Sequence, residues 1–172
     1  MGFGTIFATI AMVVLIGISS YLFITGALFT VDTLSKSLKI ANELDNERLK
    51  TEIEIVEVVT VGNNDIYAKI NNTGSTKILK SEFKHIDVFV YYDVVGASMG
   101  YIFLWVPYTE TSPPENDHWR VESISPDSIN PGISDPDEQM EIWIRVQENT
   151  DTGNTSWLKV VMPNGVSASK YF

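Results

Sequence analysis

Residues able to do chemistry are few and widely spaced in this chain. The two histidines, His85 and His118, have no partner histidine at metal-ligand spacing. We expect His85 on a strand and His118 in a loop rich in proline and acidic residues. Cysteine is absent, which excludes thiol catalysis, disulfide bonds and thiolate metal sites. No glycine-rich phosphate loop, nucleophile elbow or zinc-protease motif occurs. We therefore expect no catalytic residue, cofactor or metal, and favour a binding or structural protein over an enzyme.

Acidic residues cluster around one proline-rich loop, between Pro126 and Pro136. Clustered carboxylates are the ligands that Ca²⁺ prefers, but the regular spacing of an EF-hand loop is missing. A solvated acidic loop is the favoured interpretation. The residues concerned are Asp127, Asp135, Asp137 and Glu138.

Two Asn-x-Ser/Thr sequences mark candidate N-glycosylation sites. They begin at Asn71 and Asn154, and both fall at expected turns or strand ends, where acceptor residues must lie. They favour a domain that faces outward.

Aromatic residues on the polar phase of expected strands are candidates for an interface. These are Tyr91, Trp143 and Trp157. A second sheet face packed inside a sandwich explains them equally well. The same ambiguity applies to Tyr101, Phe103 and Trp105.

An uncharged N-terminal segment, Met1 to Val31, must position everything that follows. It contains no acidic, basic or amide residue and no proline. About 20 apolar residues span the ~30 Å hydrocarbon core of a bilayer, where a helix satisfies its own backbone groups. A soluble core helix would instead be amphipathic. The segment is too long for a signal-peptide core and follows no basic region, so we expect it to be retained.

From Asp32 to Lys50 the pattern becomes that of an amphipathic helix. Val31, Leu34, Leu38, Ala41 and Leu44 recur at three- and four-residue steps among charged residues. No glycine or proline interrupts this part, so we predict one continuous helix over residues 1–50. Its second half either covers the globular domain or forms a stalk that packs against copies of itself or a partner.

After Thr51 the hydrophobic pattern changes to a period of two. Seven or eight short alternating segments follow, separated by turn sequences and with no helical segment between them. A shift of phase near Val56 predicts a bulge. Residues 51–172 are therefore predicted to form an antiparallel β-sandwich. The lack of cysteine excludes an antibody-type core but not the sandwich architecture.

Charge limits the partners of this domain and leaves its side of the membrane open. The net charge is −10, which argues against nucleic acid and against anionic lipid surfaces. Lysine and arginine follow the apolar segment but none precedes it, so the positive-inside rule predicts a cytoplasmic domain. The two glycosylation sequences predict the opposite.

The sequence resembles the type IV pilin-like proteins of archaea. The resemblance rests on the opening Met1-Gly2-Phe3-Gly4 with its apolar run, on residues 71–76 followed by 87–90, and on residues 119–132. Among these proteins it is similar to the archaellar (archaeal flagellar) accessory F family or its sister G family. The resemblance implies an α+β arrangement, in which a long transmembrane α-helix precedes an all-β, antiparallel, immunoglobulin-like β-sandwich.

The resemblance also implies a function. It suggests a stator of the archaellum motor, anchored in the archaeal cell membrane, with an extracellular sandwich that binds S-layer protein. The sister G protein or other archaellum components would be further partners, in a homo- or hetero-oligomer, and a dimeric sandwich is expected. The alternative is a subunit of a helical archaeal surface filament, to be expected if a basic leader precedes the numbered residues. A third hypothesis is a membrane-tethered solute-binding or enzymatic domain.

Overall fold

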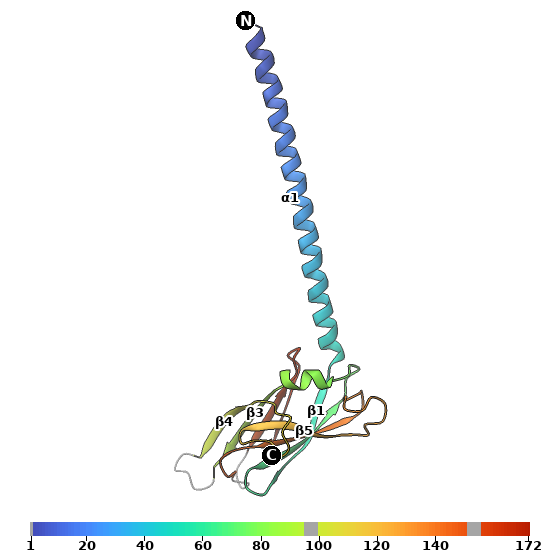
Figure 1. Cartoon of the computed structure of the whole chain (residues 1–172), viewed down its shortest axis with the longest axis vertical. Coiled ribbons are helices and arrows are strands. Elements are labelled where there is room, and N and C mark those ends of the chain that lie inside the picture. The colour runs from blue at the N-terminus through green and yellow to red at the C-terminus, as the bar shows by residue number, and fades with distance from the viewer. Residues whose placement is uncertain (1, 95–99, 151–155) are drawn as a thin grey trace. The chain divides into compact units, whose positions relative to one another are not determined.

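The computed structural model describes residues 2–94, 100–150 and 156–172. The chain divides into two compact units, Met1–Asp45 and Asn46–Phe172. The first unit is helical, and the second contains all the strands. Figure 1 shows both units.

Helix α1 spans Phe3–Lys50 without a break, and none of its residues is buried. Its apolar part has a mean hydropathy of 2.3 over 18 residues, and it is the one helix in the described chain that is long and apolar enough to cross a membrane. Threonine hydroxyls bond inside the helix: Thr9 donates to the Thr5 carbonyl at 2.6 Å and Thr25 to the Tyr21 carbonyl at 2.9 Å. These polar groups therefore need no water.

The second unit is a sandwich of two antiparallel sheets, as predicted (Figure 1). One sheet has the strand order β1-β2-β6-β5, and the other has the order β4-β3-β7-β8. A short 3₁₀-helix, η1, connects β2 to β3. The elements in chain order are β1 (Ile53–Val61), β2 (Asp65–Asn72), η1 (Lys80–His85), β3 (Asp87–Asp93), β4 (Tyr101–Val106), β5 (His118–Ser125), β6 (Gln139–Arg145), β7 (Trp157–Val161) and β8 (Ser167–Tyr171).

The core lies between the two sheets and follows from the alternation along each strand. In β2 and β6 every second residue is buried, including Ile66 and Ile142 at 0 % exposure. The other sheet contributes Val88 and Leu158, also fully buried. Burying one such aliphatic side chain stabilises the fold by about 1.5–3 kcal/mol. The inward-facing residues of each strand thus hold the two sheets together, and the outward-facing residues can serve other roles.

The predicted phase shift in the first strand is confirmed, and the two histidine placements are wrong. The register of β1 against β2 shifts between Ile55 and Glu57, as a bulge does. His85 is not on a strand but ends the 3₁₀-helix η1. His118 is not in a loop but begins β5, and its Nδ1 lies 2.9 Å from the Asn116 carbonyl oxygen.

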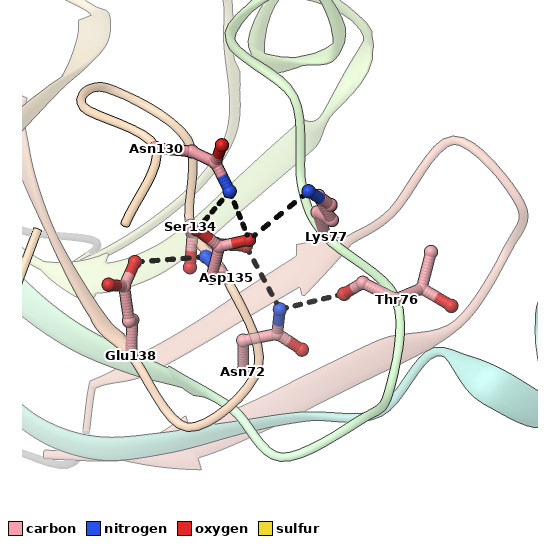
Figure 2. Close-up of polar contacts among 7 residues, drawn as sticks. All are labelled: Asn72, Thr76, Lys77, Asn130, Ser134, Asp135 and Glu138. Atoms are coloured by element: carbon pink, nitrogen blue, oxygen red, sulfur yellow. Dashed lines mark hydrogen bonds and ion pairs between the residues drawn. The ribbon is translucent and has the colours of Figure 1, made fainter. Parts of the chain in front are cut away.

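The expectation of a solvated acidic loop is wrong for two of its four acidic residues. Asp135 and Glu138 are only 5 % and 4 % exposed. Asn130 Nδ2 donates to both Asp135 carboxylate oxygens, at 3.0 and 2.8 Å, and Lys77 Nζ lies 3.7 Å from Oδ1 (Figure 2). The Asp135 amide donates to Glu138 Oε2 at 2.9 Å. Both carboxylates are buried because they bind groups of their own loop.

Asn72 connects this loop to the turn after β2 (Figure 2). It is 1 % exposed, and its Nδ2 donates to the carbonyl oxygens of Thr76 at 2.8 Å and Ser134 at 3.1 Å. Within the described residues, no three histidine or acidic side chains are grouped to hold a metal ion. In this polar cluster, the hydrogen bonds of Asn72 hold the loop against the turn after β2, and those of Asn130 hold Asp135 within the loop.

Candidate interaction surface

A row of aromatic residues crosses the outer face of sheet β4-β3-β7-β8. Phe103 of β4 pairs with Tyr91 of β3, Tyr91 pairs with Trp157 of β7, and Trp157 pairs with Tyr171 of β8. Residues directly opposite in neighbouring strands lie on the same side of a sheet. Four strands therefore contribute one ring each to a single line. Three more rings lie on the same side of the sheet. We call the whole surface the aromatic face, and its residues are Phe89, Tyr91, Tyr101, Phe103, Trp105, Trp157 and Tyr171.

The period-two pattern explains why these rings point outward. In β3, Val88 and Val90 are buried, whereas Phe89 and Tyr91 are half-buried. In β7, Leu158 is buried next to the half-buried Trp157. Successive side chains point to opposite faces of a strand, so the aliphatic phase fills the core and the aromatic phase is left outside.

Neighbouring rings on the aromatic face are stacked in parallel. The centroids of Tyr91 and Tyr101 are 5.0 Å apart with an interplanar angle of 2°, and those of Phe89 and Phe103 are 5.7 Å apart at 7°. Phe103 also stacks on Trp157 at 6.4 Å and 26°. Such pairs contribute about 0.5–1.5 kcal/mol each beyond area burial. The rings thus hold one another in place while part of their surface stays open.

The aromatic face is widely exposed. Trp105, Tyr101, Phe103 and Tyr171 are 52 %, 53 %, 62 % and 70 % exposed. Scattered apolar residues are normal on a protein surface, whereas a contiguous aromatic patch is typical of an interaction site. Tyrosine and tryptophan are also the residues most enriched at interfaces.

The aromatic face carries little charge, although the chain is strongly acidic. The charged residues at outward positions of its four strands are Asp87, Asp93 and Lys159. Trp105 Nε1 donates to Asp87 Oδ1 at 2.9 Å. These three residues sum to −1, against −10 for the whole chain. A partner meets little electrostatic repulsion here.

Trp143, the third candidate interface residue, lies on the other sheet. Its Nε1 donates to Asp65 Oδ1 at 2.9 Å, and its ring stacks on Tyr67 with centroids 5.5 Å apart. The Arg145 guanidinium lies 5.0 Å from the ring centroid and also bonds Asp65. Burial raises the pKa of Tyr67 above its usual range, and the charge of Asp65 adds to this effect. Of the three candidate interface residues, Tyr91 and Trp157 thus lie together on one sheet, and Trp143 lies on the other.

The two glycosylation candidates stay predictions. Asn71 lies on the outer face of β2, half-buried, and its Oδ1 accepts a hydrogen bond from Gln139 Nε2 at 2.9 Å. Asn154 lies outside the described residues.

Sequence reasoning missed Phe89 and Tyr171 as members of the aromatic face. The signal was present in both strands as an aromatic residue on the polar phase. Tyr101, Phe103 and Trp105 had this signal too, but whether their outward side was covered depended on the packing of the two sheets.

The sequence model of the archaeal-type flagellin family matches residues 1–172. An uncharacterized protein of Archaeoglobus fulgidus is 29% identical over 175 residues, which cover 100% of this chain and 96% of that protein.

Three solved structures are similar in part. The archaellum periplasmic stator protein FlaG of Sulfolobus acidocaldarius is 22% identical, with 71% of this chain and 99% of that chain covered and a TM-score of 0.49. A chain of the FlaF and FlaG stator complex of the same organism is 22% identical, with coverages of 71% and 89% and a TM-score of 0.49. Flagellin FlaB1 of Methanocaldococcus jannaschii is 14% identical, with coverages of 71% and 88% and a TM-score of 0.47.

Proposed function

Because the chain belongs to the archaeal-type flagellin family, we propose that it is a non-enzymatic stator of the archaellum, anchored in the membrane by α1. The observation that carries the proposal is the uncharged stretch of α1 from Phe3 to Val31, in which no residue is buried. At ~1.5 Å per residue this stretch is roughly 40 Å long, enough to cross a hydrocarbon core of ~30 Å. Lipid is one surrounding that covers such an apolar surface.

The sandwich lies outside the cell in this proposal, in the pseudoperiplasm. The basic residues after the apolar stretch argue for the opposite side by the positive-inside rule. The role of a surface appendage and the candidate glycosylation site at Asn71 support an outward domain.

The aromatic face is the surface we propose for contact with a fixed partner, the S-layer protein. A stator must hold the torque-generating rotor against something that does not turn. Parallel ring stacks present a stiff surface, because each ring is held by its neighbour. The sister G protein or other archaellum components are further proposed partners.

A second candidate function is a subunit of a helical archaeal filament. The family match and the length of the uncharged stretch favour it, because this stretch exceeds what one membrane crossing needs. Gly4, Ala8, Gly17 and Gly26 are small residues at which helices can approach closely. In a filament, α1 would pack against the same helix of other copies instead of lipid.

Imaging the full-length protein together with its intact mass distinguishes the two functions. An unprocessed chain in discrete particles that retains purified S-layer protein is the result expected of the stator. A processed chain in long helical fibres would instead establish the filament subunit.

A variant locates the contact surface in the same assay. We expect Tyr171→Ala to weaken S-layer retention, because this ring is 70 % exposed on the aromatic face. Ile129→Ala is the matched control, since Ile129 is 76 % exposed but lies in the loop between β5 and β6. Equal retention by both variants and the wild type would place the contact elsewhere.

A further inference from the structure

The two sheets have four edge strands, β1, β5, β4 and β8, and three of these edges carry a protective feature. Strand β8 carries the charged Lys170, which binds β1. An unprotected edge offers unpaired backbone groups to another strand, so proteins blunt it with charges, bulges or a cover. Strand β1 has a bulge and is contacted from β8, where Lys170 Nζ donates to the Val56 carbonyl at 2.7 Å. Strand β5 has a bulge between Val121 and Ser123, and its start is covered where the Thr109 amide donates to the Trp119 carbonyl at 2.8 Å.

Among the residues that the structure describes, strand β4 has none of these features. Its sequence, Tyr-Ile-Phe-Leu-Trp-Val from Tyr101 to Val106, contains no charge and no proline. Its register against β3 runs without a shift from Val88–Val106 to Asp93–Tyr101. Within the part of the chain that the structure describes, β3 is its one neighbour in the sheet (Figure 1). The unpaired backbone groups of such an uncharged, regular edge can pair with another strand.

The sequence of β4 is symmetric in residue type about Phe103. An aliphatic residue follows on each side, Ile102 and Leu104, and then an aromatic one, Tyr101 and Trp105. Two copies of this strand can therefore run antiparallel with Phe103 opposite itself. Every aromatic residue then faces an aromatic residue on the outer side, and every aliphatic residue faces an aliphatic one on the core side.

We propose that β4 pairs antiparallel with β4 of a second copy of this chain, about a two-fold axis at Phe103. In this register Tyr101 lies opposite the partner's Trp105, and Ile102 lies opposite the partner's Leu104. The two four-stranded sheets become one continuous sheet, and the two aromatic faces join into one surface. A symmetric contact of this kind uses the same patch on both copies and closes without forming an open fibre.

The net charge of the chain and the surface area of the contact both affect the pairing of two copies. Two chains of net charge −10 repel each other, but β4 places no charge at the contact. Three half-exposed rings and one strand edge bury less than the roughly 800 Å² per partner of a standard interface. Pairing thus needs a high local concentration, which confinement to a membrane supplies. In this respect the proposal rests on the proposed membrane anchoring.

Single cysteines test the pairing cleanly, because the natural chain has none. We expect full-length Phe103→Cys in lipid vesicles to form a covalent dimer with a short thiol-specific cross-linker, since directly opposite Cβ atoms lie about 5 Å apart. Tyr171→Cys is the matched control: it lies on the same face, on the far edge strand β8, and we expect at least a tenfold lower yield. Equal yields, or none at position 103, would overturn the proposal.

The register has its own test. Tyr101→Cys chains alone should cross-link poorly, because Tyr101 and the partner's Tyr101 would be four residues apart along the strand, about 13 Å. A mixture with tagged Trp105→Cys chains should give the mixed dimer. Efficient cross-linking of Tyr101→Cys alone would exclude the proposed register.

Failure of the membrane anchor can be told apart from failure of pairing. All variants are first floated with the vesicles on a density gradient, and their folding is checked by circular dichroism. A variant that floats and is folded but does not cross-link at position 103 contradicts strand pairing and leaves the anchor intact. A wild-type chain that does not float contradicts the anchor. In that case, cross-linking of the Phe103→Cys chain in detergent at high concentration tests the pairing without a membrane.

Discussion

At the scale of single residues, Asp65 is the most strongly bonded carboxylate on the outer face of sheet β1-β2-β6-β5. Arg145 donates to both of its oxygens, at 2.8 and 3.1 Å, and Trp143 donates at 2.9 Å. Burial by itself raises the pKa of Asp65. The hydrogen bonds from Arg145 and Trp143, together with the charge of Arg145, lower it by more, so the pKa lies below the usual 3.8.

Asp65→Asn is expected to lower the free energy of unfolding by about 1–2 kcal/mol at pH 7, because charged hydrogen bonds are lost. The folded-state pKa is depressed, so the ionised Asp65 stabilises the fold above its unfolded pKa, and this stabilisation is lost as pH falls through the folded pKa. Urea unfolding should therefore show a difference at pH 7 that shrinks below 3.8.

The control for Asp65→Asn is Glu57→Gln. Glu57 also pairs with a cation, Lys69, at 2.7 Å, but both side chains are largely exposed. Solvent screens such a pair, so a much smaller change is expected. If the two variants lost equal stability, burial of the Asp65 network would not matter.

In the polar cluster of Figure 2, Asn72 binds both the turn after β2 and the loop before β6. Asn72→Ala leaves the carbonyl oxygens of Thr76 and Ser134 without their side-chain donor in a buried place. We expect a loss of about 2–3 kcal/mol in urea unfolding. The neighbouring Asn71→Ala removes one half-buried hydrogen bond, to Gln139, and should cost clearly less. A larger loss for Asn71→Ala would contradict this account of the loop.

At the scale of elements, the turn after β2 packs closely on the end of α1 and the start of β1. The Gly74 amide donates to the Glu52 carbonyl at 3.0 Å, and the Ser75 amide donates to the Lys50 carbonyl at 2.8 Å. A Cβ atom on Gly74 would lie 2.5 Å from both the Lys50 carbonyl oxygen and the Glu52 amide nitrogen. Only glycine fits there without a shift of the backbone.

Gly74→Ala is therefore expected to destabilise the sandwich by about 1–3 kcal/mol, the usual effect of forcing an extra group into a packed place. Thermal unfolding followed by circular dichroism measures this change. Ser75→Ala is the control, because the Ser75 hydroxyl is 3.5 Å from its acceptor and contributes little. An unchanged melting temperature for Gly74→Ala would show that the turn can move away.

At the scale of the whole molecule, the uncharged part of α1 is expected to decide where the protein resides. Leu15→Lys places a charge in the middle of the apolar stretch, where a lysine costs about 2.5–3.5 kcal/mol in membrane insertion. We expect a smaller membrane fraction on gradient flotation. Leu38→Lys, in the part of α1 that already carries charges, should float like the wild type. Equal flotation of both variants would argue against a membrane-spanning α1.

The sequence by itself determined the elements of this protein. The uncharged run and the unbroken helical pattern predict one helix, and α1 spans Phe3–Lys50. Period-two alternation predicts seven or eight strands, and the described residues form eight. These features are readable because each depends on residues close together in the chain.

Only the tertiary structure decided which residues meet. Alternation places Tyr91, Trp143 and Trp157 on the outward phase of their own strands but does not say which strands share a sheet. The pairing of β3 with β7 joins Tyr91 to Trp157, and the pairing of β2 with β6 takes Trp143 to the other sheet. In the same way, Asp135 and Glu138 look solvated in sequence and are buried by loop contacts. Strand order and loop burial depend on the packing of segments far apart in the chain, because the common core must be filled by all of them at once.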